Sequence, residues 1–383
     1  MILLSNEQKE LNLLLLLISS RDLQEERIAN LIKNINWDLF VELAIHHKVY
    51  SILYTRLKRL NQMAVPVFVL DILEKEYKRN SYMMLELCAE TIRVSNVLIE
   101  NDVKTISLKG PILGYELYGD ITLRTSKDID LLVSENDISK SKVILEQLGY
   151  ICLDRVDDFL RSSRKWHEHH LSFYHPIKKI EIELHWRLNT GSIKELVFNQ
   201  LWESRTASKL NKNVYLLGEA DLFMYLAIHG AGHAWFRLKW LLDMDRIINK
   251  NEKVDNVLRN MDLYNNSSIG AQSLILAESL LGTPITRSVK DTHFTKKSRK
   301  LAKMSMLFIR NVVQFDNLPT LLRIYFRIYL LFINPTHQKI KYVYSQLLPN
   351  KRDFMTLKLP KQLFFLYFLL KPLLWVLRQF KLR

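Results

Sequence analysis

The sequence is poor in cysteine, glycine and proline. Its 383 residues include only two cysteines, Cys88 and Cys152, ten glycines and nine prolines. Two cysteines so far apart cannot form a disulfide framework or a cysteine-based zinc site, and they favour a reducing cytoplasm. The apolar stretch 11–18 is short and follows charged residues. It therefore predicts a helix rather than a signal peptide or a membrane span.

Positive charge is concentrated near the C-terminus. The chain carries a formal charge of +15, yet residues 287–383 hold 20 Lys and Arg against three Asp, a net charge of +17. The first 286 residues therefore carry about −2. This asymmetry indicates either an anionic partner, such as nucleic acid, a membrane surface or a phosphorylated substrate, or simply a solvated basic face.

Four stretches follow from the hydrophobic patterning. Residues 1–95 and 191–345 have helical spacing with few breaks, and residues 346–383 form a basic, aromatic tail. Residues 96–190 hold the strand patterns, which makes them the core of an α+β protein framed by helical regions. We find no internal repeat and no low-complexity linker.

The core stretch shows a regular order of elements. We expect strands at 103–108 and 129–133, a helix at 138–148, an extended run from 149, and a hairpin of 170–174 and 180–186 around a turn at 175–179.

Two aspartates lie on one of these strands. Asp128 and Asp130 are two residues apart, so their side chains share one face of the strand. Two carboxylates this close are stable only near positive charge, and a divalent cation is the usual solution. The preceding strand ends in Lys109 and Gly110, where a phosphate could approach the backbone at a helix N-terminus.

A third carboxylate is expected on the second hairpin strand. Glu181, Glu183 and His185 alternate with apolar residues that face the core. Metal-assisted nucleotidyl transfer needs such a third acid beside an aspartate pair. We favour Glu183, with Glu181 as the competing choice.

Several segments together resemble the nucleotidyltransferase superfamily. The resemblance is closest to a bacterial branch known only as uncharacterised nucleotidyltransferases. It rests on Leu108-Lys109-Gly110, Tyr118-Gly119, Arg124, Asp128-Ile129-Asp130, Glu183-Leu184-His185-Trp186, the stretch from His229 to Asp243, the helix with Ala44, His47 and Val49, and weakly on Leu359-Pro360 and Leu370-Lys371-Pro372.

The resemblance implies a five-stranded mixed sheet of the polymerase-β type, with Asp128 and Asp130 as metal ligands. Many members have Gly-Gly or Gly-Ser after the first strand, where this chain has Lys109-Gly110 and then Pro111. We expect the charge of Lys109 to act on phosphate in their place. Glu183 stands where Asp is common in the wider superfamily.

Other residues are candidates for nucleotide binding. Arg124, just before the aspartate strand, could clamp a triphosphate. Lys239 is either a helix partner of Asp243 or a phosphate contact. His229 and His233 have the i,i+4 spacing of metal ligands, but the Gly-Ala-Gly between them favours close helix packing. A zinc site, a phosphate or base contact and a structural role all remain open for these two histidines.

The histidine-rich run 166–170 precedes the hairpin. Strand alternation would send His167 and His169 to one face and His170 to the other, so we expect no complete metal site there. In the tail, the apolar run 362–370 is interrupted at Lys371-Pro372 and is too short to span a bilayer. We expect it to pack on the body of the protein or to lie on anionic lipid.

The sequence thus predicts a cytoplasmic, Mg²⁺-dependent nucleotidyltransferase, with Mn²⁺ as the alternative metal. It would move an NMP group from an NTP, with ATP as the first choice, to a small-molecule, peptide or RNA acceptor. The alternative is a non-catalytic module of the same fold that docks on nucleic acid or anionic membrane through its basic C-terminal part.

Overall fold

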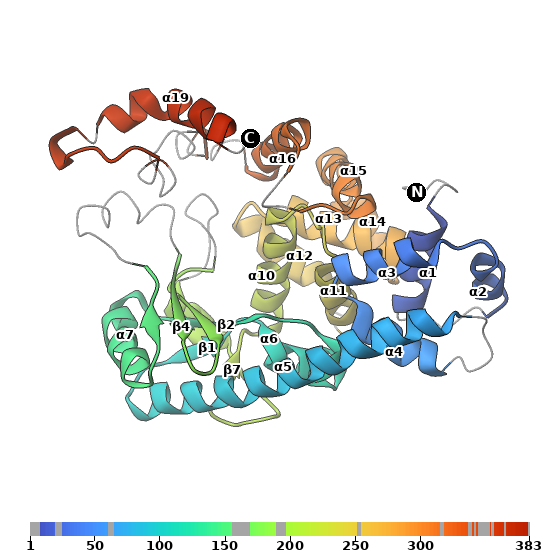
Figure 1. Cartoon of the computed structure of the whole chain (residues 1–383), viewed down its shortest axis with the longest axis horizontal. Helices are drawn as coiled ribbons and strands as arrows, with labels where there is room; N and C mark the ends of the chain where they lie inside the picture. The colour runs from blue at the N-terminus through green and yellow to red at the C-terminus, as the bar shows by residue number, and fades with distance from the viewer. Residues whose placement is uncertain are drawn as a thin grey trace.

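The computed structural model describes residues 8–19, 25–59, 65–154, 169–188, 197–250, 254–314, 318–335, 339–340, 342–343, 353, 356–363 and 365–381. Helices surround one mixed sheet. In Figure 1 the long helix α5 (Val67–Glu100) runs along the lower side, below the sheet and below the N-terminal helices. One end of α5 packs against α4 (Tyr50–Arg59), and the other lies under the sheet. The predicted boundary at residues 95–96 therefore falls inside a continuous helix.

The remaining helices lie before, within and after the sheet region. They are α1 (Lys9–Ile18), α2 (Glu25–Ile32), α3 (Trp37–His46), α6 (Gly110–Tyr118), α7 (Ile138–Gln147), α9 (Phe198–Ser204), α10 (Glu219–Gly232), α11 (Leu238–Lys250), α12 (Val254–Leu263), α13 (Ser267–Leu276), α14 (Arg287–His293), α15 (Lys296–Arg310), α16 (Thr320–Ile333) and α19 (Leu366–Lys381). Short helical turns are η1 (Ile121–Leu123), η2 (Glu135–Asp137), η3 (Ala277–Leu281) and η5 (Lys361–Leu363).

The sheet has seven strands in the order β3-β4-β5-β2-β1-β7-β6. Their bounds are β1 (Thr105–Ser107), β2 (Asp128–Val133), β3 (Ile151–Cys152), β4 (His170–His175), β5 (Ile180–His185), β6 (Thr206–Ala207) and β7 (Tyr215–Leu216). The central pair β2 and β5 is parallel, while β1 pairs with β2, and β4 with β5, in antiparallel fashion.

Most predicted strands are confirmed, including both strands of the hairpin. The predicted helix at 138–148 is also confirmed, as α7. The expectation of an all-helical stretch from 191 to 345 is wrong at one place. There β7 adds to the sheet beside β1, and β6 pairs with β7. Each of these strands has only two residues, too few to produce an alternating pattern that the sequence analysis could detect. With them the sheet has seven strands instead of the expected five.

The two faces of the sheet differ as strand alternation predicts. Ile180, Ile182 and Leu184 of β5 are buried, in a cluster with apolar residues of α5 and α7. Glu181 and Glu183 point to the opposite face and are only partly buried. Since α5 and α7 cover the apolar face, the acidic face is the one available for chemistry.

The C-terminal helix α19 includes Lys371 and Pro372, where the apolar run of the sequence is interrupted, and continues to Lys381. Among the described residues, no helix is long and apolar enough to cross a membrane.

The end of α3 is joined to the start of α11 through His47. The His47 Nδ1 atom accepts a hydrogen bond from the Leu238 backbone N–H at 3.4 Å, and the His47 carbonyl accepts one from Lys239 N at 3.3 Å. His47 is fully buried. Burial, with a smaller effect of neighbouring His46, lowers the pKa of His47 from 6.5 to about 3.

This burial predicts acid sensitivity. The unfolded chain protonates His47 below pH 6.5, whereas the folded chain resists protonation down to about pH 3, so stability falls as pH drops through that window. At pH 5 the loss from this residue is about 2 kcal/mol. We expect His47→Gln to lose less stability than wild type between pH 7 and pH 5, measured by urea unfolding. Equal losses in the two proteins would contradict this role.

Candidate functional site

The acidic residues meet on the two central strands. In the parallel pair β2–β5, Asp128 lies opposite Glu181 and Asp130 opposite Glu183. Directly opposed residues on neighbouring strands point to the same face. Four carboxyl groups therefore gather on one face of the sheet.

Asp130 is the most enclosed of the four, with no exposed surface. Its Oδ1 atom lies 2.8 Å from Lys109 Nζ and 3.2 Å from His185 Nε2. Its Oδ2 atom is buried and has no hydrogen-bond partner among the described residues. One oxygen is thus neutralised by protein cations, and the other is left available to a further ligand.

The charges of this group reinforce one another. Burial alone would raise the pKa of Asp130, but Lys109 and His185 hold it well below its usual value. Burial would likewise lower the pKa of Lys109, which the carboxylate of Asp130 raises above its ordinary range. Burial also opposes protonation of His185, and hydrogen bonds to Asp130 and Glu183 outweigh it and raise its pKa.

The two glutamates differ in their surroundings. Glu183 Oε2 lies 3.2 Å from His185 Nε2. Burial raises the pKa of Glu183, but this hydrogen bond brings it below its usual value. The pKa of Glu181 is raised, by burial and by the nearby carboxylates of Glu183 and Asp128. Glu183 is therefore the better anionic ligand at neutral pH.

These residues also form a group suited to a metal ion. Asp130, Glu183 and His185 each offer a ligand atom, and these atoms lie within 4.8 Å of one another. Asp128 is outside this group, and its Oδ1 atom accepts a hydrogen bond from Ser126 Oγ at 3.2 Å. The sequence placed His185 on the acidic face but did not identify it as a possible ligand.

The expected separation of the hairpin histidines is wrong. His169 and His170 both approach His185, and one ligand atom from each of the three lies within 4.8 Å of the others. Strand β4 begins only at His170, so strand alternation does not govern His169. The expectations for His167 and the other residues of 166–168 lie outside the described residues.

The loop beside the acidic face begins helix α6. Lys109 is the N-cap of this helix, and Gly110 has a φ of +82°. That backbone conformation strongly favours glycine, and it brings the first turn of α6 next to the carboxylate pair. The free N–H groups of a helix N-terminus are suited to phosphate.

The comparison with protein families agrees with this geometry. A model described as "Uncharacterised nucleotidyltransferase" matches residues 33–282, more than half of the chain. The chain belongs to this nucleotidyltransferase family. The matched region includes both the sheet and helices α3 to α13, so the helical signature around His229 is part of the same unit. A search of curated proteins gives no match.

Arg124 forms a buried ion pair with Asp243. Its Nε and NH2 groups contact the Asp243 carboxylate at 3.0–3.2 Å, and its NH1 group donates to the Gly110 carbonyl at 3.3 Å. The Tyr118 hydroxyl also donates a hydrogen bond to Asp243. The structure thus favours a supporting role for Arg124 behind the Gly110 loop over the expected triphosphate clamp.

Lys239 contacts the segment that joins η1 to β2. Its Nζ atom donates to the Thr125 carbonyl at 3.1 Å, and the carboxylate of Asp243 is taken by Arg124 instead. Burial, with the nearby charges of Arg124 and Arg237, lowers the pKa of Lys239 to about 7. Lys239 therefore lies close behind the β2 strand and has less of its usual positive charge.

His229 and His233 are packed with Trp240. The His233 and Trp240 rings are stacked, with centroids 4.9 Å apart, and the His229 ring meets both rings edge-on. A Cβ atom at Gly230 would collide with the Trp235 ring, which confirms that the small residues permit close packing. Burial and nearby Lys109 lower the pKa of His229 well below its usual value. Both histidines are thus neutral, aromatic neighbours of the site.

Sequence reasoning missed Tyr225 of α10. Tyr225 is buried. Burial raises the pKa of its hydroxyl, nearby Lys109 lowers it, and the carboxylates of Asp130 and Glu183 add to the increase. Its place within the run of apolar residues in α10 makes it look like an ordinary core residue.

Breaking the buried Arg124–Asp243 pair has a predictable cost. We expect Arg124→Met and Asp243→Asn each to lower the free energy of unfolding by about 3–5 kcal/mol, because each leaves one buried polar group uncompensated. The double variant should lose less than the sum of the two. Urea unfolding at pH 7 measures the free energy of unfolding of all three variants. Losses that add up in the double variant, or single losses below about 1 kcal/mol, would argue against a coupled pair.

Proposed function

We propose that this protein is a metal-dependent nucleotidyltransferase that moves an NMP group from an NTP to an acceptor and releases pyrophosphate. The observation that carries the proposal is the register of β2 and β5. It pairs Asp128 with Glu181 and Asp130 with Glu183 on one sheet face, next to the glycine-containing start of α6. The family match supports transfer of this class.

The residues present fit a divalent cation. The Oδ2 atom of Asp130 is buried without a partner, and Glu183 and His185 offer further ligand atoms nearby. We propose Asp128, Asp130 and Glu183 as the carboxylates that hold Mg²⁺, with Mn²⁺ as the alternative, and add His185 as a neighbour of the ligand set. When bound, the cation would neutralise the triphosphate and favour loss of the acceptor's proton.

The protein's own residues would hold the nucleotide. Lys109 carries a positive charge on the acidic face, with its Nζ atom 2.8 Å from Asp130 Oδ1. We expect the phosphate oxygens to bind close to this charge. The backbone N–H groups of Gly110 and Ile112 at the start of α6 would donate to the same oxygens, whereas Pro111 between them has no N–H to donate. Arg124 would act through this loop, since it donates to the Gly110 carbonyl.

The remaining nucleotide contacts stay proposals. Lys239 lies behind Thr125, and His229 is packed on Trp240, so each would act on the nucleotide only from the rim of the site. ATP is our first choice of NTP, and a cytoplasmic location remains a prediction. The acceptor could be a small molecule, a peptide or an RNA. No contact among the described residues favours the non-catalytic docking module.

The aspartates give the first test. We expect Asp128→Asn/Asp130→Asn to abolish Mg²⁺-dependent binding and turnover of NTPs, because the two carboxylates would hold the cation that attracts the triphosphate, and asparagine carries no charge to hold it. Asp102→Asn is the matched control: it makes the same change at an exposed residue whose φ of +53° suits asparagine. Full turnover by the double variant would refute the proposal.

The glutamates give a second test. We expect Glu183→Gln to reduce turnover at least about 100-fold, because it removes an ionised carboxylate next to Asp130. Glu181→Gln should reduce turnover much less, since its carboxyl is opposite Asp128 and is less readily ionised. Initial rates with saturating Mg²⁺ compare the two variants. The reverse order would make Glu181 the third acid.

A further inference from the structure

A cationic cavity lies apart from the acidic face. It has a volume of about 640 Å³ and is bounded by α4, the end of α6, η1 and α11. This volume is in the range of cavities that hold small-molecule ligands. None of the residues that line it belongs to the carboxylate site described above.

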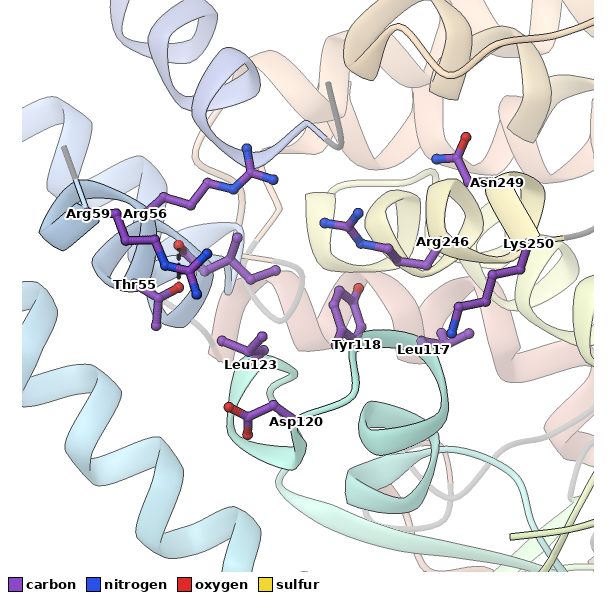
Figure 2. Close-up of a pocket in the computed structure, with 11 residues that line it drawn as sticks. Thr55, Arg56, Arg59, Leu117, Tyr118, Asp120, Leu123, Arg246, Asn249 and Lys250 are labelled. Atoms are coloured by element: carbon purple, nitrogen blue, oxygen red, sulfur yellow. Dashed lines mark hydrogen bonds between the residues drawn. The ribbon is translucent and has the colours of Figure 1, made fainter. Parts of the chain in front are cut away.

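Four basic side chains converge on this cavity from two helices. Arg56 and Arg59 reach in from α4, and Arg246 and Lys250 from α11 on the opposite side (Figure 2). One carboxylate, Asp120, also lines the cavity. Its Oδ1 atom accepts hydrogen bonds from the Thr122 N–H and hydroxyl, so it is already engaged in capping η1. The lining is therefore strongly positive, although the first 286 residues of the chain are nearly neutral.

Lys250 donates a hydrogen bond to the Glu116 carbonyl at 2.6 Å, and the three arginines are only partly compensated by the protein itself. Arg56 and Arg59 make no ion pair or hydrogen bond with any other described residue. The Nε atom of Arg246 is buried without a partner, and its NH1 atom is 4.0 Å from Asp245. Burial, Arg246 and Arg59 lower the pKa of Arg56, and the carboxylate of Asp245 opposes them only in part. Like charges held this close need an anion to relieve their repulsion.

Other polar groups could complete an anion site. Tyr118, Thr55 and Asn249 line the same cavity, and Arg246 lies 5.5 Å from the Tyr118 ring centroid. Fork-shaped guanidinium groups from two sides match the several oxygens of a phosphate group, which a single carboxylate would not fill.

We propose that this cavity binds a small molecule bearing two or more phosphate groups, at a second site separate from the acidic face. We favour a small ligand over a nucleic acid, because the cations come from two helices around one partly open cavity whose volume is typical of small-molecule sites.

The cavity has a physical connection to the nucleotide loop. Tyr118 is the last residue of α6, whose first residue is Gly110. From Tyr118 the hydrogen bonds continue to Asp243, Arg124 and the Gly110 carbonyl. An anion that orders Tyr118 would therefore also act on the other end of α6, about 13 Å away by the rise of a nine-residue helix.

The test uses inorganic pyrophosphate and the purified full chain in buffer with EDTA, so that binding that depends on a divalent metal is suppressed. We expect calorimetry to show one pyrophosphate per chain. Arg56→Gln/Arg246→Gln should weaken this binding about tenfold or more. Arg287→Gln/Arg259→Gln removes the same charge at exposed positions and should leave binding unchanged.

Three outcomes would overturn the proposal: no pyrophosphate binding by the wild type, equal weakening by the control pair, or binding lost in Lys109→Gln but kept in Arg56→Gln/Arg246→Gln. The last outcome would place the anion at the α6 loop. If the double variant does not fold, the exposed single variant Arg59→Gln replaces it, with a smaller but measurable loss of affinity expected. Because no metal or turnover is involved, failure here would leave the proposed transferase activity untouched.

Discussion

A fully buried carboxylate at the centre of the sheet is the constraint on which the site depends. An ionised Asp130 in this position would be costly unless cations neutralise it. Lys109 comes from the end of the preceding strand and His185 from the neighbouring strand, and both contact the same oxygen. Neutralising the Asp130 carboxylate thus requires the loop into α6, the register of β2 on β5 and the position of His185 to be as they are.

A second buried pair holds the loop from behind. Arg124 follows η1, four residues before β2, whereas Asp243 belongs to α11, more than a hundred residues later in the chain. Together with the His47 contacts to α11, this pair attaches the helical region to the sheet region. The family match spans both regions, which agrees with a single structural unit whose helices are part of the site's support.

The sequence predicted the parts of the structure that local patterns determine. Period-two alternation located β2, β4 and β5 and placed Asp128, Asp130 and Glu183 on one face, as the register shows. It could not predict that Arg124 would choose Asp243, because many acidic residues were available and only tertiary packing selects among them. It also failed at His169, just outside its strand, where no regular period applies.

Distance along the chain explains the other omissions. The strand β7 pairs with β1 from more than a hundred residues away, and two residues carry no recognisable pattern. Arg56 and Arg246 look like ordinary surface arginines of two amphipathic helices until α4 and α11 come together. Interactions of this kind depend on the whole fold, and no short segment records them.

The sheet order has a consequence for the way this protein is made. Helix α5 needs only its own residues, so it can form as soon as it leaves the ribosome. Strand β2, however, is flanked by β1, made before it, and by β5, made about fifty residues later, and β1 itself waits for β7. Until residue 216 has been synthesised, the growing chain exposes an unpaired edge of the sheet at β1. A chaperone that shields this intermediate would therefore be of most use during the middle third of synthesis.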